Sequence, residues 1–374
     1  MINIGFDARF AFGEKRGIGI YSINLITQLI LNNNTNNYYL FVDSDDYIKD
    51  SFFAEKNVYI IKLPIAFYPI WEQVLLPIYA KMYNLDILHC LGNTAPLFNF
   101  KSYKLICTIH DVFYMKHFSF NKTPFLKQKL GRFYRKVNVP RIVNKCDAII
   151  TVSNFSRNDI CNELNITNKE VDVTYLGTSR LFEGERHIEK NDIPKIGMTI
   201  TGKDPQKNVI NLIKSLEQIF DNKLLDKFII VGIKKNDFYE YLPLKYLKQI
   251  EIIEFATQKE IKNLLQEVYV FVFVSFYESF GIPALEAMKC GVPVIVSNTG
   301  ALPEILNEQS MTIDPLDIFD GMKKILVKLL DNQEYEKLSR KMFLRSKDFD
   351  YMITAHNTNI IYKRVLSKVG NEIE

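Results

Sequence analysis

Short apolar runs alternate with longer, helix-like stretches along most of the chain. The first series of runs comprises 2–6, 38–42, 58–63, 87–90, 105–109, 148–152 and 171–175. A second series comprises 195–201, 227–231, 250–255, 269–274 and 292–296, with 310–313 as a short edge strand. Such alternation is typical of a parallel sheet with helices on both faces. The pattern predicts two α/β units of similar size with a cleft between them.

The alternation breaks between Ser179 and Pro194, where Glu, Arg, Lys, Asn and Asp occur without an apolar period. Such a stretch is typical of a linker. A chain of 374 residues is too long for one ordinary core and suits two domains of about 150 to 200 residues. We therefore predict an N-terminal domain at 1–178 and a C-terminal domain at 179–351.

Composition narrows the class of protein. Hydrophobic residues make up 47% and charged residues 24%, as in soluble globular proteins. A formal charge of +4 is too mild to indicate nucleic acid as a partner. The five scattered cysteines indicate free thiols in a reducing cytoplasm. We see no secretion signal, and the apolar runs fall short of the roughly 18 residues of a membrane span, so we expect a cytoplasmic protein with at most peripheral membrane contact.

The segment 271–296 predicts a strand, a loop, a helix and a second strand in that order. Val and Phe fill its first residues, Pro283 suits the first turn of a helix over 282–289, and Gly291 ends that helix. A helix N-terminus presents free N–H groups and the positive end of its dipole. We therefore expect the loop before this helix to attract phosphate.

Two glutamates mark this unit, Glu278 in the loop and Glu286 on the second helical turn. Eight residues at about 1.5 Å each place the carboxylates up to ~12 Å apart, whereas hydrolytic pairs lie within roughly 5 to 9.5 Å. A surface helix with two solvated acids accounts for the spacing alone, but the flanking glycines and prolines favour a ligand site. A nucleotide sugar fits it, with its hexose at Glu278 and its ribose at Glu286. Its diphosphate would lie against the backbone N–H groups of Ser279, Phe280, Gly281 and Ile282.

The same segment, E-S-F-G-I-P-A-L-E followed by G-V-P-V-I, resembles the signature of the retaining glycosyltransferases of family 4. The resemblance implies the GT-B fold, in which two Rossmann-like parallel-sheet domains face a central cleft. It also implies that the C-terminal helix, 352–374, packs back on an acceptor-side first domain, and that the second domain binds the donor. In that family the first glutamate, here Glu278, serves the donor sugar and the second, Glu286, the ribose.

The run 105–109 ends in His110 and Asp111, at the sheet edge where parallel strands bind ligands. A lone strand-end histidine is more often structural. In the resembling family an H-D pair at this strand end places the histidine beside the donor sugar, and we expect that role for His110. We expect His89 to support the neighbouring strand end instead. The histidines show no metal-ligand spacing, and we expect no cofactor.

Two glycines, Gly17 and Gly19, precede a helix-like run from Ser22 to Leu31. They permit close approach of the backbone to a ligand, and the stretch resembles the donor and acceptor loop of family 4, although Ile20 replaces the usual arginine. A purely structural loop and a dinucleotide site are the alternatives. The dinucleotide reading is weakened because ten residues separate the first strand from Gly17.

The run Asp43-Ser44-Asp45-Asp46 spells the D-x-D pattern that holds a divalent metal in another glycosyltransferase fold. That fold has one principal domain, whereas the alternation predicts two. Acidic residues in this pattern are also typical of an ordinary solvated loop. We therefore expect no metal.

Lys203 and Lys207 lie in a loop between a predicted strand and a helix starting at Val209. Cations there would face the diphosphate and offset the charge that develops on the leaving nucleotide. The resembling family usually has an arginine and a lysine in this loop. Lys207 matches the lysine, but Gln206 stands where the arginine is common, so Lys203 would have to supply the second charge. Solvated loop lysines are the alternative.

The stretch 122–141 interleaves Lys127, Lys129, Arg132, Arg135, Lys136 and Arg141 with aromatic and aliphatic residues. It suits an anionic membrane surface or a lipid-linked acceptor. A helix that packs on its own sheet and solvates its charges accounts equally well for the pattern.

The sequence as a whole indicates a metal-independent, retaining hexosyltransferase of mannose or glucose type. Its partners would be a nucleotide diphosphate sugar and a glycan or lipid-linked acceptor in cell-surface polysaccharide synthesis. Two other classes stay open. A sugar-nucleotide epimerase could use the same fold, and the departures at Ile20 and Gln206 suit a non-catalytic sugar-nucleotide sensor or scaffold.

Overall fold

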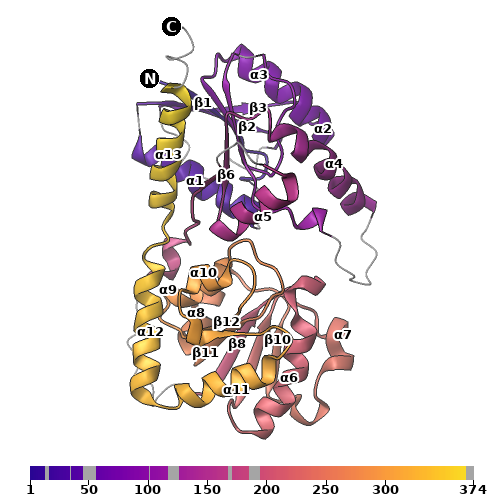
Figure 1. Cartoon of the computed structure of the whole chain (residues 1–374), viewed down its shortest axis with the longest axis vertical. Coiled ribbons are helices and arrows are strands. Elements are labelled where there is room, and N and C mark those ends of the chain that lie inside the picture. The colour runs from indigo at the N-terminus through magenta and orange to yellow at the C-terminus, as the bar shows by residue number, and fades with distance from the viewer. Residues whose placement is uncertain are drawn as a thin grey trace. The chain divides into compact units, whose positions relative to one another are not determined.

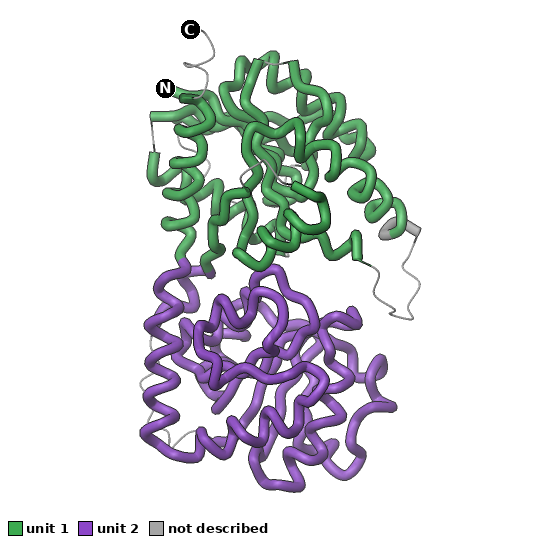
Figure 2. Tube along the Cα trace, viewed as in Figure 1, with its two compact units in different colours: residues 1–177, 350–374 green, residues 178–349 purple. Residues whose placement is uncertain are grey.

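The computed structural model describes residues 1–12, 17–33, 35–44, 56–100, 102–116, 126–166, 171–184 and 194–367. The chain forms two compact units. Unit 1 comprises Met1–Gly177 and Asp350–Glu374, and unit 2 comprises Thr178–Phe349 (Figure 2). Most of the predicted linker, 185–193, lies outside the described residues.

Unit 1 contains a seven-stranded sheet in the order β3-β2-β1-β4-β5-β6-β7. All its strand pairs are parallel, as the apolar runs predict. The strands are β1 (Asn3–Asp7), β2 (Asn37–Val42), β3 (Val58–Lys62), β4 (Ile87–Cys90), β5 (Lys104–Thr108), β6 (Ala148–Thr151) and β7 (Val171–Val173). The chain winds outward in opposite directions from β1 and β4. Open α/β sheets generally bind ligands where the winding direction changes, at the carboxyl edge of the strands.

Helices flank this sheet (Figure 1). They are α1 (Ile18–Asn32), α2 (Tyr68–Ile70), the π-helical η3 (Trp71–Leu75), α3 (Leu76–Met82), η4 (Phe113–Met115), α4 (Leu126–Ile142), α5 (Asn154–Leu164) and α13 (Tyr351–Ser367). The side chain of Ser153 caps α5 by accepting the N–H of Ser156 at 3.0 Å.

The C-terminal helix α13 packs on unit 1 beside α1 (Figure 1). Three polar contacts anchor it. Tyr362 bonds His89 through its hydroxyl group at 2.7 Å, and Thr354 donates to the carbonyl of Tyr175 at 2.6 Å. Arg364 pairs with Asp172 on β7 at 2.9 Å.

Unit 2 contains a six-stranded sheet in the order β10-β9-β8-β11-β12-β13, again with parallel pairs. Its strands are β8 (Ile196–Ile200), β9 (Lys227–Val231), β10 (Ile250–Ile253), β11 (Val270–Phe273), β12 (Val294–Ser297) and β13 (Thr312–Ile313). Its α-helices are α6 (Val209–Asp221), α7 (Lys235–Phe238), α8 (Gln258–Glu267), α9 (Ile282–Lys289), α10 (Leu302–Leu306), α11 (Ile318–Leu329) and α12 (Asn332–Ser346). The shorter turns are η5 (Arg180–Phe182), η7 (Pro205–Lys207), η8 (Tyr239–Tyr241), η9 (Leu244–Tyr246) and η10 (Gln309–Met311). The winding direction changes between β8 and β11.

The start of α1 differs from the prediction. The helix begins at Ile18 rather than Ser22, so Gly19 lies in its first turn instead of in a loop. The reason is burial, because Tyr21 belongs to the same buried stripe as Leu25 and Leu29. Packing of that stripe extends the helix by a turn despite the cost of a helical glycine.

In the described part of the chain, no helix is long and apolar enough to cross a membrane.

Gly177→Ala should destabilise unit 1, because an added Cβ would lie 2.4 Å from the backbone nitrogen of Tyr351, where α13 begins. We expect a loss of about 1 to 3 kcal/mol of unfolding free energy, measured by urea titration. Gly131→Ala is the matched control. A Cβ there meets nothing within 4 Å, and alanine should stabilise α4 by up to about 1 kcal/mol. Equal stability of the two variants would contradict the close packing at Gly177.

Candidate functional site

Two neighbouring loops at the carboxyl edge of the unit 2 sheet carry most of the predicted site residues. One follows β8 and leads into α6, and the other follows β11 and leads into α9. Because β8 and β11 are adjacent parallel strands, both loops emerge side by side. The N–H of Phe276 donates to the carbonyl of Gln206 at 2.8 Å. The Asn208 side chain donates to the carbonyl of Val274 at 3.0 Å, which ties the loops together.

The structure brings Lys207 and Glu278 into direct contact. The Lys207 Nζ lies 2.6 Å from Glu278 Oε1, and their side chains are 28% and 12% exposed. The same ammonium group lies 5.7 Å from the centre of the Phe273 ring. The pair is therefore partly sheltered, so its attraction is screened less than that of a surface pair. Lys203, in contrast, is exposed and forms no ion pair with another described residue.

A third loop, after β12, supports the backbone of Glu278. The N–H of Ala301 donates to the Glu278 carbonyl at 2.9 Å. Gly300 has φ +65°, and an added Cβ would lie 2.7 Å from that carbonyl oxygen and 2.8 Å from the Glu278 nitrogen. The sequence reasoning missed this support. The Thr299-Gly300 pair after a buried strand was its only signal.

Helix α9 spans Ile282–Lys289, as the sequence predicts. Gly281 is its N-cap with φ 110° and ψ 50°, a conformation that favours glycine. The Phe280 side chain is buried and packs edge-on against Phe349, with ring centroids 5.7 Å apart. Phe280 therefore fixes the loop through its ring. Backbone N–H groups at the start of α9 have no partner within the helix itself.

Glu286 lies on the second turn of α9 and is only 7% exposed. Burial raises the pKa of its carboxyl group to about 8. No charged or hydrogen-bonding group in the described part of the chain offsets that burial. A buried acid without a partner is costly and marks a place where a ligand could supply the missing hydrogen bonds.

In unit 1, His110 lies directly beyond β5 at the carboxyl edge. Its Nε2 bonds the carbonyl of Leu91 at 3.0 Å, and its backbone N–H donates to the side chain of Asn93 at 2.6 Å. A carbonyl only accepts, so Nε2 carries the proton and Nδ1 is the acceptor. Burial lowers the pKa of His110 to about 4, so the ring is neutral at pH 7. Asn93 is a second residue that the sequence reasoning missed.

Tyr21 connects the glycine segment to His110. Its ring lies 4.7 Å from the imidazole at an interplanar angle of 87°. Its hydroxyl group bonds Thr108 at 3.0 Å, and Thr108 bonds His89 Nε2 at 2.8 Å. His89 in turn bonds Tyr362 at 2.7 Å. His89 thus supports the neighbouring strand end as expected, and this buried chain of hydrogen bonds runs from α1 to α13.

Gly17 is the N-cap of α1, with φ 36°, and an added Cβ would meet nothing within 4 Å. Its preceding residue, Arg16, lies outside the described residues. Gly19 is buried in the first helical turn.

The predicted D-x-D loop is only partly visible. Asp43 pairs with Arg9 at 2.6 Å, and Asp45 and Asp46 lie outside the described residues. Among the residues that are described, no group of three or more His, Cys, Asp or Glu side chains could hold a metal ion.

Comparisons with known proteins identify the family. The model described as "Glycosyltransferase Family 4" matches residues 40–179, and the model described as "Glycosyl transferases group 1" matches residues 185–343. "O-antigen chain mannosyltransferase B" of Escherichia coli is 25% identical over 70% of this chain and 70% of its own. "MMP alpha-(1->4)-mannosyltransferase" of Mycolicibacterium hassiacum is 24% identical over 77% of this chain and 72% of its own.

A solved glycosyltransferase from Rickettsia africae superposes with a TM-score of 0.73 at 17% identity, covering 98% of both chains. This likeness concerns the fold. The sequence matches favour a glycosyltransferase over the sensor and epimerase alternatives. Together the two family models cover most of the chain. The chain belongs to glycosyltransferase family 4 and has the GT-B fold.

Proposed function

We propose that the protein is a retaining, metal-independent hexosyltransferase. It moves a mannose- or glucose-type sugar from a nucleotide diphosphate to a hydroxyl group of a glycan or lipid-linked acceptor. Unit 2 binds the donor, and unit 1 serves the acceptor side. The names of the mannosyltransferase relatives support a mannose donor and a place in cell-surface polysaccharide synthesis.

One arrangement of residues carries this proposal. The Lys207–Glu278 pair lies in the loops beside the N-terminus of α9, and the buried carboxyl group of Glu286 lies on the second turn of α9. A sugar diphosphate matches this order of groups. Glu278 would accept hydrogen bonds from the hexose, and the ribose hydroxyls would satisfy Glu286. Lys207 and the N–H groups at the start of α9 would face the diphosphate.

In the proposed reaction, the acceptor oxygen attacks the anomeric carbon on the side of the leaving group. The bond between that carbon and the phosphate oxygen breaks, and the departing phosphate takes the acceptor proton. Lys207 offsets the charge that grows on the leaving diphosphate. Neutral His110 offers Nδ1 as an acceptor for a donor-sugar hydroxyl, which orients the sugar without adding charge.

Glu278→Gln and His110→Asn should each lower kcat/KM for transfer by about 100-fold or more, because each removes an oriented acceptor for the sugar. Product mass spectrometry measures transfer, NMR of the product anomer checks retention, and EDTA checks metal independence. Glu308→Gln is the matched control, since it removes the ion pair of Glu308 with Lys341 outside the two loops. Wild-type turnover in both site variants would refute the site. Strict dependence on Mn²⁺ or Mg²⁺ would refute metal independence.

Donor affinity should strengthen as the pH rises toward 8. The pKa of Glu286 is about 8 without ligand, so its carboxyl group is protonated below that pH. Ribose hydroxyls that donate to the carboxylate lower this pKa, so binding releases a proton. The dissociation constant should fall by up to about tenfold per pH unit in this window. Calorimetry with GDP-mannose and UDP-glucose measures affinity and proton release.

The Glu286→Gln variant should bind the same donor more weakly at pH 8 and should show no proton release, because an amide does not titrate. A wild-type affinity that is independent of pH, with no released proton, would contradict the role of Glu286.

A further inference from the structure

An apolar stripe runs along the outer side of α2, η3 and α3. Ile70, Val74, Ile78 and Met82 follow one another at four-residue spacing, about one helical turn each. They are 51%, 46%, 46% and 57% exposed. Phe67, just before α2, is 69% exposed. Single exposed apolar residues are ordinary, but a continuous row of this kind indicates a binding surface.

Helix α4 adds a second exposed row. Leu130, Phe133 and Val137 are 55%, 67% and 38% exposed. Val139 and Ile142 of the same helix are buried in the core of unit 1. Residues 122–125 lie outside the described residues, and the membrane interpretation of 122–141 stays a prediction. One side of α4 packs on the sheet, and another presents apolar side chains to solvent.

A buried polar cluster joins the two helical elements. Asn138 of α4 donates to the carboxylate of Glu72 on η3 at 2.9 Å, and the Tyr134 hydroxyl group bonds the same carboxylate. Gln73 donates to Tyr134 at 2.8 Å. The two rows therefore belong to neighbouring helices of one unit. We call them the α3–α4 face, defined by Ile70, Val74, Ile78, Met82, Leu130, Phe133 and Val137.

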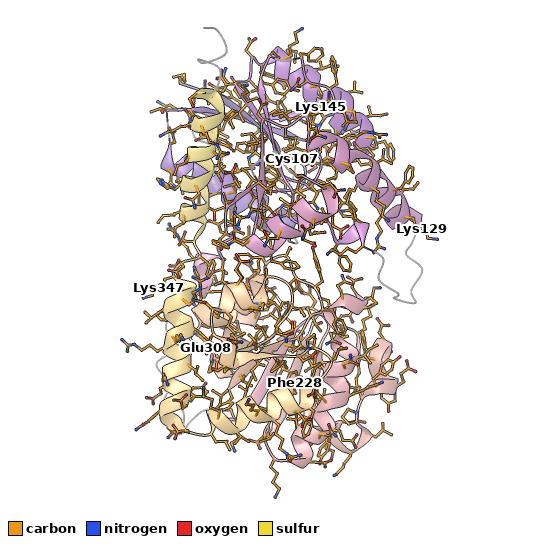
Figure 3. The ribbon with its side chains drawn as sticks, viewed as in Figure 1. Cys107, Lys129, Lys145, Phe228, Glu308 and Lys347 are labelled. Carbon is orange, nitrogen blue, oxygen red and sulfur yellow. The ribbon has the colours of Figure 1, made fainter. Side chains whose placement is uncertain are left out.

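The charge of this face has one sign. The exposed cations on its two elements are Lys81, Lys129, Arg132, Lys136 and Arg141. Lys129 lies near the start of α4 and Lys145 beyond its end (Figure 3). Glu72 is the only acidic residue in 64–82, and it is buried, while 126–145 contains none. Such a surface complements a layer of negative charge that covers an apolar interior.

Self-association would fit this face poorly. A symmetric dimer places the same patch of both copies together, so the cations of one copy would face those of the other. In unit 2 the most exposed apolar side chains, Leu244, Phe255 and Leu316, belong to three different connections rather than to one helical row. The α3–α4 face therefore differs from ordinary surface exposure.

We propose that the α3–α4 face docks unit 1 on an anionic phospholipid bilayer. The apolar rows enter the headgroup boundary, and the cations pair with lipid phosphates. The proposal extends the proposed function, because a lipid-linked acceptor would be met at that surface. It does not depend on sugar transfer, since vesicle binding is measured without donor or acceptor.

The test is co-sedimentation of the full chain with vesicles of phosphatidylcholine, with and without phosphatidylglycerol. We expect binding that requires phosphatidylglycerol and weakens with salt. The double variant Ile78→Ser, Phe133→Ser should lose binding at low salt. The double variant Arg132→Gln, Lys136→Gln should bind more weakly by about fivefold for each charge removed. The control Leu244→Ser, Leu316→Ser removes apolar side chains of unit 2 that are more exposed than Ile78 and Phe133, and it should bind like the wild type.

Three outcomes of these measurements would contradict membrane docking. Absence of binding to anionic vesicles, or equal binding by wild type and both face variants, would overturn it. So would a dimer, seen by light scattering, that the Ile78→Ser, Phe133→Ser variant abolishes. Glycosyl transfer to a water-soluble acceptor by all variants, measured alongside, keeps this outcome separate from failure of the proposed function.

Discussion

The ion pair between Lys207 and Glu278 is the interaction on which the unit 2 site depends. It joins the loop after β8 to the loop after β11 at 2.6 Å, and each partner would otherwise be a largely buried charge without compensation. Parallel pairing of the two strands delivers both loops to one edge. The glycines at 281 and 300 then let the backbone adopt the conformations that hold Glu278 there. The pair therefore fixes the spacing of the two loops before any ligand arrives.

Burial acts in opposite senses on one titratable group in each unit, His110 of unit 1 and Glu286 of unit 2. It lowers the pKa of His110 to about 4 and raises that of Glu286 to about 8. Both groups are consequently neutral near pH 7, and Lys207 with Glu278 forms the charged pair between the two described loops. In the proposed function, Lys207 and the backbone dipoles would offset the charge of the diphosphate, while His110 and Glu286 would bind sugar hydroxyls.

Much of this organisation could be predicted from the residues alone. The apolar runs gave both parallel sheets, because fully buried strands need continuous Val, Ile and Phe. Pro283 and Gly291 predicted both ends of α9 correctly, because each residue acts locally on the backbone. The start of α1 was misplaced, because burial of Tyr21 is a tertiary effect that outweighs the local preference of Gly19. Asn93 and Gly300 were missed for a similar reason, as each acts on a residue distant in the chain.

The path of the chain has a consequence for how the molecule is made. Unit 2 is continuous, Thr178–Phe349, and is inserted between the two segments of unit 1. The first of these segments lacks α13, and with it the hydroxyl group of Tyr362 that His89 needs. During synthesis on the ribosome, unit 2 can close its own core while unit 1 still waits for its last helix. The half of the protein that is translated first is therefore the half that matures last.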